Sequence, residues 1–289
     1  MRISKLKLLS AMGIFGTIGI FVKYIPLSSA AIALTRGVTG VLFLVAVMLL
    51  TGRKSDPTAI RKNLLLLILS GAAIGFNWVA LFESYNYTTV ATATACYYLA
   101  PLFLLLASPL LGEKLTRKKL ACVGIALMGM LLLSGIGDGP LPTLGELKGI
   151  LLATCAAALY ATVMFLNKKL SPIGAYDKTV IQLSAAAIVI LPYLLLSEGF
   201  TPPALTGLQW GLLVLVGIVH TGIAYALYFD SLKQLPAQTV ALFSYLDPVI
   251  AIILSALLLK EPMTPSGMIG TVLILGSALY SELPERKRT

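Results

Sequence analysis

The chain has 289 residues, of which 58% are hydrophobic and 12% are charged. A soluble domain has about 25% charged residues, so this composition excludes an ordinary soluble protein and indicates a membrane protein. The formal net charge of +10 requires no nucleic-acid partner, because the basic residues gather in the loops between apolar segments, where they indicate membrane topology.

Apolar segments follow one another along the whole chain, each long enough to cross about 30 Å of hydrocarbon as a helix. We predict an all-α membrane protein with ten transmembrane helices joined by short loops. The predicted helices span residues 6–25, 30–51, 63–86, 88–111, 119–136, 148–167, 179–197, 208–229, 237–259 and 266–283.

Lysine and arginine are concentrated in every second loop, and short cytoplasmic loops carry the excess of these residues. Of the 22 basic residues, all but Lys23, Arg36, Lys148 and Lys260 fall at the ends that this rule assigns to the cytoplasm. We therefore expect a multi-pass protein of the cytoplasmic membrane with both termini in the cytoplasm.

The chain contains an internal repeat, because residues 75–101 resemble residues 222–248 at a constant offset of 147 positions. This self-similarity predicts two repeats, residues 1–140 and residues 141–289. Five crossings in each repeat is an odd number, so the second repeat is expected to be inverted, an architecture that recurs in secondary transporters. The identical pairs are Gly75 and Gly222, Phe82 and Phe229, Ser84 and Ser231, Thr92 and Thr239, Tyr98 and Tyr245, Leu99 and Leu246, and Pro101 and Pro248.

The fourth and ninth spans end in related motifs, Gly-Glu-Lys-Leu-Thr at 112–116 and Lys-Glu-Pro-Met-Thr at 260–264. With these motifs, and with Tyr-Leu-Asp-Pro at 245–248, the chain resembles the EamA domain of the drug/metabolite transporter superfamily, duplicated over its full length. The resemblance implies a ten-helix carrier with cytoplasmic termini, in which Glu113 and Glu261 brace the turns between spans. It leaves the substrate open, because the superfamily handles amino acids, nucleotide precursors, choline-like amines and toxic cations.

Polar and aromatic side chains recur near the middle of the predicted spans, where a polar group is costly enough to indicate function. We predict that they line a central substrate cavity that is aromatic and poor in charge. Such a cage attracts a cationic or zwitterionic head group. The alternative is that these aromatic residues only pack the helices together. The predicted substrate-binding residues are Asn77, Trp78, Thr94, Tyr98, Tyr160, His220, Tyr225, Tyr245 and Asp247.

Coupling and gating roles are predicted for a smaller set. Asp247 and His220, the only histidine, are expected at similar depth in adjacent spans, where a carboxylate and an imidazole could exchange a proton for a cationic substrate. A lone histidine is more often structural, and that alternative stays open. Pro101 and Pro248 each remove a backbone donor and allow a kink, and Gly16 belongs to a small-residue groove on the first span.

Other ionisable or reactive residues are interpreted as structural. Arg36, toward the outer part of the second span, is expected to pair with a carboxylate or a helix terminus rather than to bind substrate. Cys96, Cys122 and Cys155 fall inside predicted spans, where cysteine is often a small buried hydrophobe. We therefore expect no disulfide, no metal site and no cofactor.

These features predict a secondary active transporter that moves a small polar metabolite, amino-acid-like or an amine, by alternating access, with export as the expected direction and protons as a candidate coupling ion. The alternatives are a multidrug or quaternary-amine carrier of the same fold and a membrane sensor. An enzyme is not expected, because the sequence contains no catalytic set such as paired carboxylates or a histidine cluster. An ATP-driven pump is not expected either, because the sequence contains no phosphate-binding loop motif. The expected partners are a small-molecule substrate and lipid, with the protein a monomer or a weak dimer.

Overall fold

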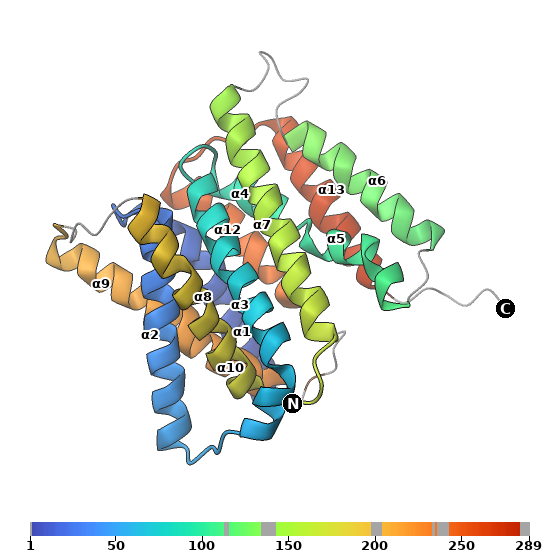
Figure 1. Ribbon diagram of the computed structural model, residues 1–289. Coiled ribbons are helices and arrows are strands. Elements are labelled where there is room, and N and C mark those ends of the chain that lie inside the picture. The colour runs from blue at the N-terminus through green and yellow to red at the C-terminus, as the bar shows by residue number, and fades with distance from the viewer. Residues whose placement is uncertain are drawn as a thin grey trace.

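Figure 1 shows the computed structural model, in which the chain forms a bundle of helices. The structure describes residues 2–112, 116–133, 143–197, 204–232, 235 and 243–283, and in these ranges all regular structure is helical. The fold is therefore all-α over the described part of the chain, as predicted. Glu113 and the predicted repeat boundary at residues 140–141 lie outside the described residues.

The helices follow the predicted spans closely. The first half contains α1 (Arg2–Lys23), α2 (Ser29–Leu50), α3 (Pro57–Ser84), α4 (Val90–Tyr97), α5 (Ala100–Leu106), the 3-10 turn η1 (Ser108–Leu111) and α6 (Arg117–Leu133). The second half contains α7 (Leu144–Lys168), α8 (Ala175–Ser197), α9 (Gly207–Leu215), the π-helical segment η2 (Val216–Ile223), α10 (Ala224–Leu232), α12 (Leu246–Leu258) and α13 (Pro265–Glu282).

Six helical segments of the described chain are long and apolar enough to cross a membrane. They cover residues 2–23, 29–50, 57–84, 144–168, 175–197 and 207–231, and four shorter apolar helices accompany them. This pattern is that of a multi-pass membrane protein. The exact total of ten crossings stays a prediction.

Capping side chains define where many of these helices begin. A capping side chain accepts a hydrogen bond from a backbone N–H of the first turn that has no partner within the helix. Thr143 and Thr206 form complete capping boxes with Glu146 and Gln209, in which each side chain bonds the other's backbone. The capping residues are Ser28, Asp56, Thr89, Thr143, Thr206 and Thr264.

The fourth predicted span, residues 88–111, is interrupted by a turn close to Pro101, where the sequence allowed a kink. α4 ends at Tyr97, Tyr98 and Leu99 form a turn, and α5 follows. Pro101 explains the break, because a proline has no N–H for the carbonyl four residues earlier and its ring crowds that carbonyl. The repeat-equivalent Tyr245 is likewise non-helical, three residues before Pro248.

Contacts between the two halves come in matched pairs. α3 packs against α7 and α8, and its counterpart in the second half, the α9–η2–α10 segment, packs against α1 and α2. α1 also packs against α12, whereas α7 packs against α4 and α5, and α6 lies along α13 (Figure 1). Small residues permit close approach: a methyl group at Gly71 would meet the Ala185 side chain of α8 at 2.6 Å.

Candidate functional site

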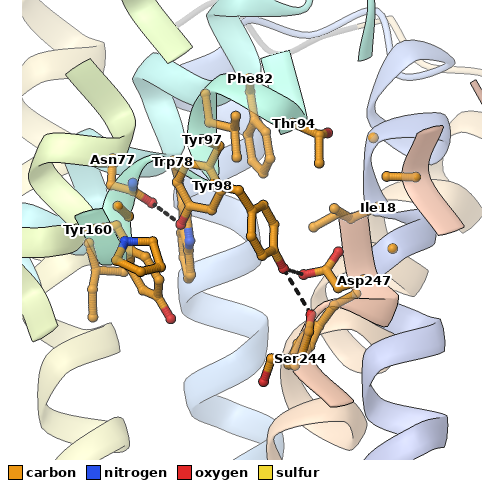
Figure 2. Close-up of a pocket in the computed structure, with 18 of the residues that line it drawn as sticks. Ile18, Asn77, Trp78, Phe82, Thr94, Tyr97, Tyr98, Tyr160, Ser244 and Asp247 are labelled. Carbon is orange, nitrogen blue, oxygen red and sulfur yellow. Dashed lines mark hydrogen bonds between the residues drawn. The ribbon is translucent and has the colours of Figure 1, made fainter. Parts of the chain in front are cut away.

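A cavity of about 390 Å³ lies where the two halves meet. Its walls come from α1, α2, α3, α4, α5, α7, α10 and α12, and several of its side chains are shown in Figure 2. The volume is within the range of about 300–1,000 Å³ that small-molecule sites occupy. Aromatic rings dominate the lining, with one arginine and one carboxylate among them.

Most of the predicted site residues line this cavity. His220 and Pro248 do not belong to the lining, although Pro248 follows Asp247 directly. Contact of any of these residues with a substrate stays a prediction. The predicted residues in the lining are Gly16, Asn77, Trp78, Thr94, Tyr98, Pro101, Tyr160, Tyr225, Tyr245 and Asp247.

The broken helices of both halves meet at Asp247. The Tyr98 hydroxyl donates to Asp247 Oδ2 at 2.9 Å and also approaches the Ser244 carbonyl oxygen at 3.2 Å (Figure 2). The rings of Tyr98 and Tyr245, which are equivalent positions of the repeat, lie 5.9 Å apart between centroids. Each interruption thus places a tyrosine in the cavity lining, and one of the two, Tyr98, orients the carboxylate.

The Asn77 side chain forms its hydrogen bonds with residues of the helices that form the cavity wall. Its Nδ2 donates to the Ala156 carbonyl of α7 at 2.5 Å, and its Oδ1 accepts from the Tyr97 hydroxyl at 3.3 Å (Figure 2). The side chain is 1% exposed. The ring of Tyr97 in turn stacks on Tyr160, with centroids 5.4 Å apart. Asn77 therefore ties α3 to α7 and orients Tyr97, a role that the sequence did not distinguish from substrate binding.

His220 lies away from the cavity lining. Its Nε2 is 2.8 Å from the Thr17 hydroxyl of α1, its ring packs on Phe21 at 5.0 Å between centroids, and its side chain is buried. The neighbouring residue on α1, Gly16, lies against the backbone of α12, where a methyl group added to it would be 2.6 Å from the Asp247 carbonyl oxygen. Among the described residues no hydrogen bond or ion pair joins His220 to Asp247, so the predicted direct pair is not formed, and Asp247 accepts from Tyr98 instead.

Arg36 is a cavity residue that the sequence analysis assigned to a structural ion pair. Its guanidinium lies 4.1 Å from the centroid of the Trp78 ring, and its Nε donates to the Thr221 hydroxyl at 2.8 Å. None of the ion pairs between described residues involves Arg36. An arginine inside an apolar span is itself a signal of function. The sequence analysis set this signal aside because it expected the long Arg36 side chain to reach the membrane interface.

One end of the cavity region is braced by Glu261. Its Oε2 accepts from the Val90 N–H at 2.8 Å and from the Ser255 hydroxyl, and its Oε1 lies 3.5 Å from Lys23 Nζ. These contacts join α1, α4 and α12. The bracing role expected for Glu261 agrees with this geometry.

Known proteins resemble this chain over nearly all of its length. The EamA-like transporter family matches it twice, at residues 3–135 and 147–281. The uncharacterized transporter YxxF of Bacillus subtilis (strain 168) is 33% identical over 256 residues, which are 86% of this chain and 79% of that protein. Protein RarD of Streptomyces exfoliatus is 26% identical over 271 residues, 91% of this chain and 83% of that protein. One solved crystal structure shares the fold, with a TM-score of 0.64 and 20% identity over 96% of both chains.

Proposed function

Because the chain belongs to the EamA-like transporter family of membrane proteins, we propose that it is a secondary active transporter that carries a small polar metabolite, amino-acid-like or an amine, by alternating access. The observation that carries this proposal is the central cavity, which is lined by both halves of the chain and contains a carboxylate, Asp247. A site built at the meeting of two repeats is accessible from either side when the halves rock against each other.

The inverted repeat is part of the proposal, and two equivalent acidic residues support it. Glu83 accepts a hydrogen bond at 2.8 Å from Ser29, the first residue of α2. Its counterpart Asp230 lies 3.3 Å from Arg53, which follows the end of α2. A helix of 22 residues is about 33 Å long. Equivalent positions of the two halves therefore lie at opposite ends of one membrane-length helix, as inversion requires.

The broken helices support a transport mechanism. Discontinuous helices in both repeats are typical of transporters, whose binding sites use the exposed backbone at the break. In this chain the breaks at Tyr98 and Tyr245 occur at equivalent positions and border the same cavity. We propose that Pro101 and Pro248 permit bending there, and that Gly16 lets α1 move closely along α12.

Proton coupling through Asp247 is a further part of the proposal. The carboxylate lies inside the cavity and accepts a hydrogen bond from Tyr98, and a buried carboxylate that meets the substrate can exchange a proton for it. Export from the cytoplasm, with both chain termini in the cytoplasm, is the proposed direction. The charged or titratable side chains that face the same cavity are Arg36, Tyr85, Tyr97, Tyr98, Tyr160, Tyr225, Tyr228 and Tyr245.

Transport into proteoliposomes tests this function. The purified protein is reconstituted and given each radiolabelled L-amino acid, and radiolabelled choline, with and without an imposed pH gradient. We expect accumulation or counterflow of at least one probe above that of protein-free liposomes. A protein that binds a probe in a thermal-shift assay but gives neither uptake nor counterflow would contradict the transporter and leave the sensor.

Side-specific labelling tests the inversion independently. Glu83→Cys and Asp230→Cys are made one at a time in a chain whose three native cysteines are replaced by alanine. We expect a membrane-impermeant maleimide added to cells to label one of the two positions only. Labelling of both positions from the same side would show that the halves are not inverted.

A further inference from the structure

Arg36 carries a positive charge in the cavity wall, and no carboxylate of the described residues contacts it directly. The side chain is 6% exposed, and no ion pair between described residues involves it. A charge held away from water is costly unless it is paired or solvated by fixed dipoles. The chain therefore maintains an arginine at this position at a cost in stability, which indicates a use for it.

The guanidinium is held on one face and one edge, and its other edge is available. Trp78 covers its face at 4.1 Å from the ring centroid, and Thr221 accepts from Nε at 2.8 Å. The two terminal nitrogens, Nη1 and Nη2, have no hydrogen-bond partner among the described residues, and they are not sealed from the cavity. These two nitrogens are the pair that forms a bidentate contact with a carboxylate.

The position of Thr221 depends on an irregular stretch of helix. Thr221 belongs to the π-helical segment η2, and π-helical turns inside α-helices occur frequently at functional sites. A methyl group at Gly40 of α2 would lie 3.1 Å from the Thr221 Cβ, so α2 and η2 are closely packed here. The packing leaves the threonine hydroxyl directed at Arg36 Nε and fixes the orientation of the guanidinium fork.

Arg36 also occupies one face of Trp78, a contact that a cationic head group would compete for. Tryptophan gives the strongest cation–π contact, within about 6 Å of the ring centroid, and the Arg36 guanidinium already lies at 4.1 Å. On this side of the cavity the place of a quaternary amine is therefore already taken by Arg36, which carries the same positive charge. No carboxylate of the described residues forms a direct ion pair with Arg36, and the carboxylate that shares its cavity, Asp247, accepts a hydrogen bond from Tyr98 instead.

We propose that Arg36 is the anion-binding residue of the cavity and receives a carboxylate of the substrate, while Asp247 faces its ammonium group. The proposal rests on the transport function argued above and narrows its substrate class to zwitterionic amino acids. Asp247 uses Oδ2 to accept from Tyr98, and its Oδ1 has no protein partner among the described residues. The two fixed charges sum to zero, so a zwitterion satisfies both and leaves no uncompensated charge in the site.

The test compares probes that differ by one charged group. A thermal-shift and binding screen of the twenty L-amino acids and choline selects the tightest amino acid, and this parent is compared with its decarboxylated amine and its deaminated acid. The protein is used as purified wild type, Arg36→Gln and Arg36→Lys, with Arg61→Gln as a control. Arg61 is exposed near the start of α3 and is not in the cavity lining.

We expect Arg36→Gln to weaken binding of the parent amino acid about tenfold or more, as loss of a charge-assisted contact does, and to leave binding of the amine within about twofold. Arg36→Lys keeps the charge without the fork, so its loss should be smaller. Arg61→Gln should equal wild type. Comparison of two probes on one variant distinguishes a lost contact from general destabilisation. If Arg36→Gln does not fold, Thr221→Val replaces it, because this variant removes only the hydrogen bond that positions Arg36.

Three results would overturn the proposal. They are equal loss of amine and amino acid binding in Arg36→Gln, unchanged amino acid binding in that variant, and a screen in which choline or amines bind but no carboxylate does. In the last case gradient-driven uptake of choline would still support a transporter. Binding of an amino acid without any uptake would instead contradict the transport function and leave the assignment of Arg36 intact.

Discussion

The contact of α1 with α12 at Gly16 gives the sharpest mechanical prediction. A methyl group placed at Gly16 would lie 2.6 Å from the Asp247 carbonyl oxygen and 2.8 Å from the Ile250 Cβ. Favourable separations between carbon atoms begin near 3.5 Å, so Gly16→Ala requires α1 and α12 to separate by about 0.7 Å. The atom that must yield first belongs to Asp247 itself, so the displacement reaches the cavity directly.

The cost of this substitution follows from ordinary overpacking. Insertion of one methyl group into a close-packed contact destabilises it by about 1–3 kcal/mol. If the penalty falls on the conformation in which α1 packs against α12, the equilibrium between the two access states shifts about 5- to 150-fold. We therefore expect Gly16→Ala to lower the transport rate at least about fivefold, and Gly16→Leu to abolish transport.

Gly13 provides the matched control for this experiment. It lies one turn earlier on α1, and a methyl group there would have no heavy atom within 4 Å. Gly13→Ala should therefore transport like wild type. Uptake into proteoliposomes is measured for all variants at equal protein, with the thermal midpoint of each. The reasoning is refuted if Gly16→Ala has normal transport, or if Gly13→Ala is impaired to the same extent.

Three further substitutions test other contacts. Asp247→Asn can still accept the hydrogen bond from Tyr98 but cannot exchange a proton, so uptake should lose its dependence on a pH gradient. An unchanged dependence in proteoliposomes would rule out proton coupling through this residue. Asn77→Leu removes the bonds that tie α3 to α7 and should lower stability by about 1–3 kcal/mol, measured as the thermal midpoint in detergent; an unaltered midpoint would contradict the bridging role. Glu261→Ala leaves the Val90 N–H and the Ser255 hydroxyl without their acceptor, so it should lower the stability of the protein by a similar amount. Glu261→Gln should cost less, because its amide carbonyl can still accept these hydrogen bonds. Equal thermal midpoints of the two variants would refute this.

The candidate site was predictable in its composition but not in the direction of its side chains. Trp78, Tyr98 and Asp247 were identifiable because aromatic and acidic residues at mid-membrane depth are unusual. Arg36 and His220 lie where the sequence did not place them, since the arginine lines the cavity and the histidine packs against α1. The sequence predicted a kink from Pro101, but it did not predict that the helix would be interrupted at Tyr98, because a proline allows a kink without specifying where the helix ends.

By itself, the amino-acid sequence determined the membrane environment, the approximate spans and the duplication, because these depend on local hydrophobicity, on loop charge and on residue identity at a fixed offset. Only the tertiary structure decided which polar residues face the cavity. A helix in lipid is apolar on nearly every side, so its sequence carries little information about which side meets the protein interior. That choice is made by neighbouring helices, as when Thr221 and Trp78 orient Arg36, or when Tyr98 orients Asp247 and Thr17 orients His220.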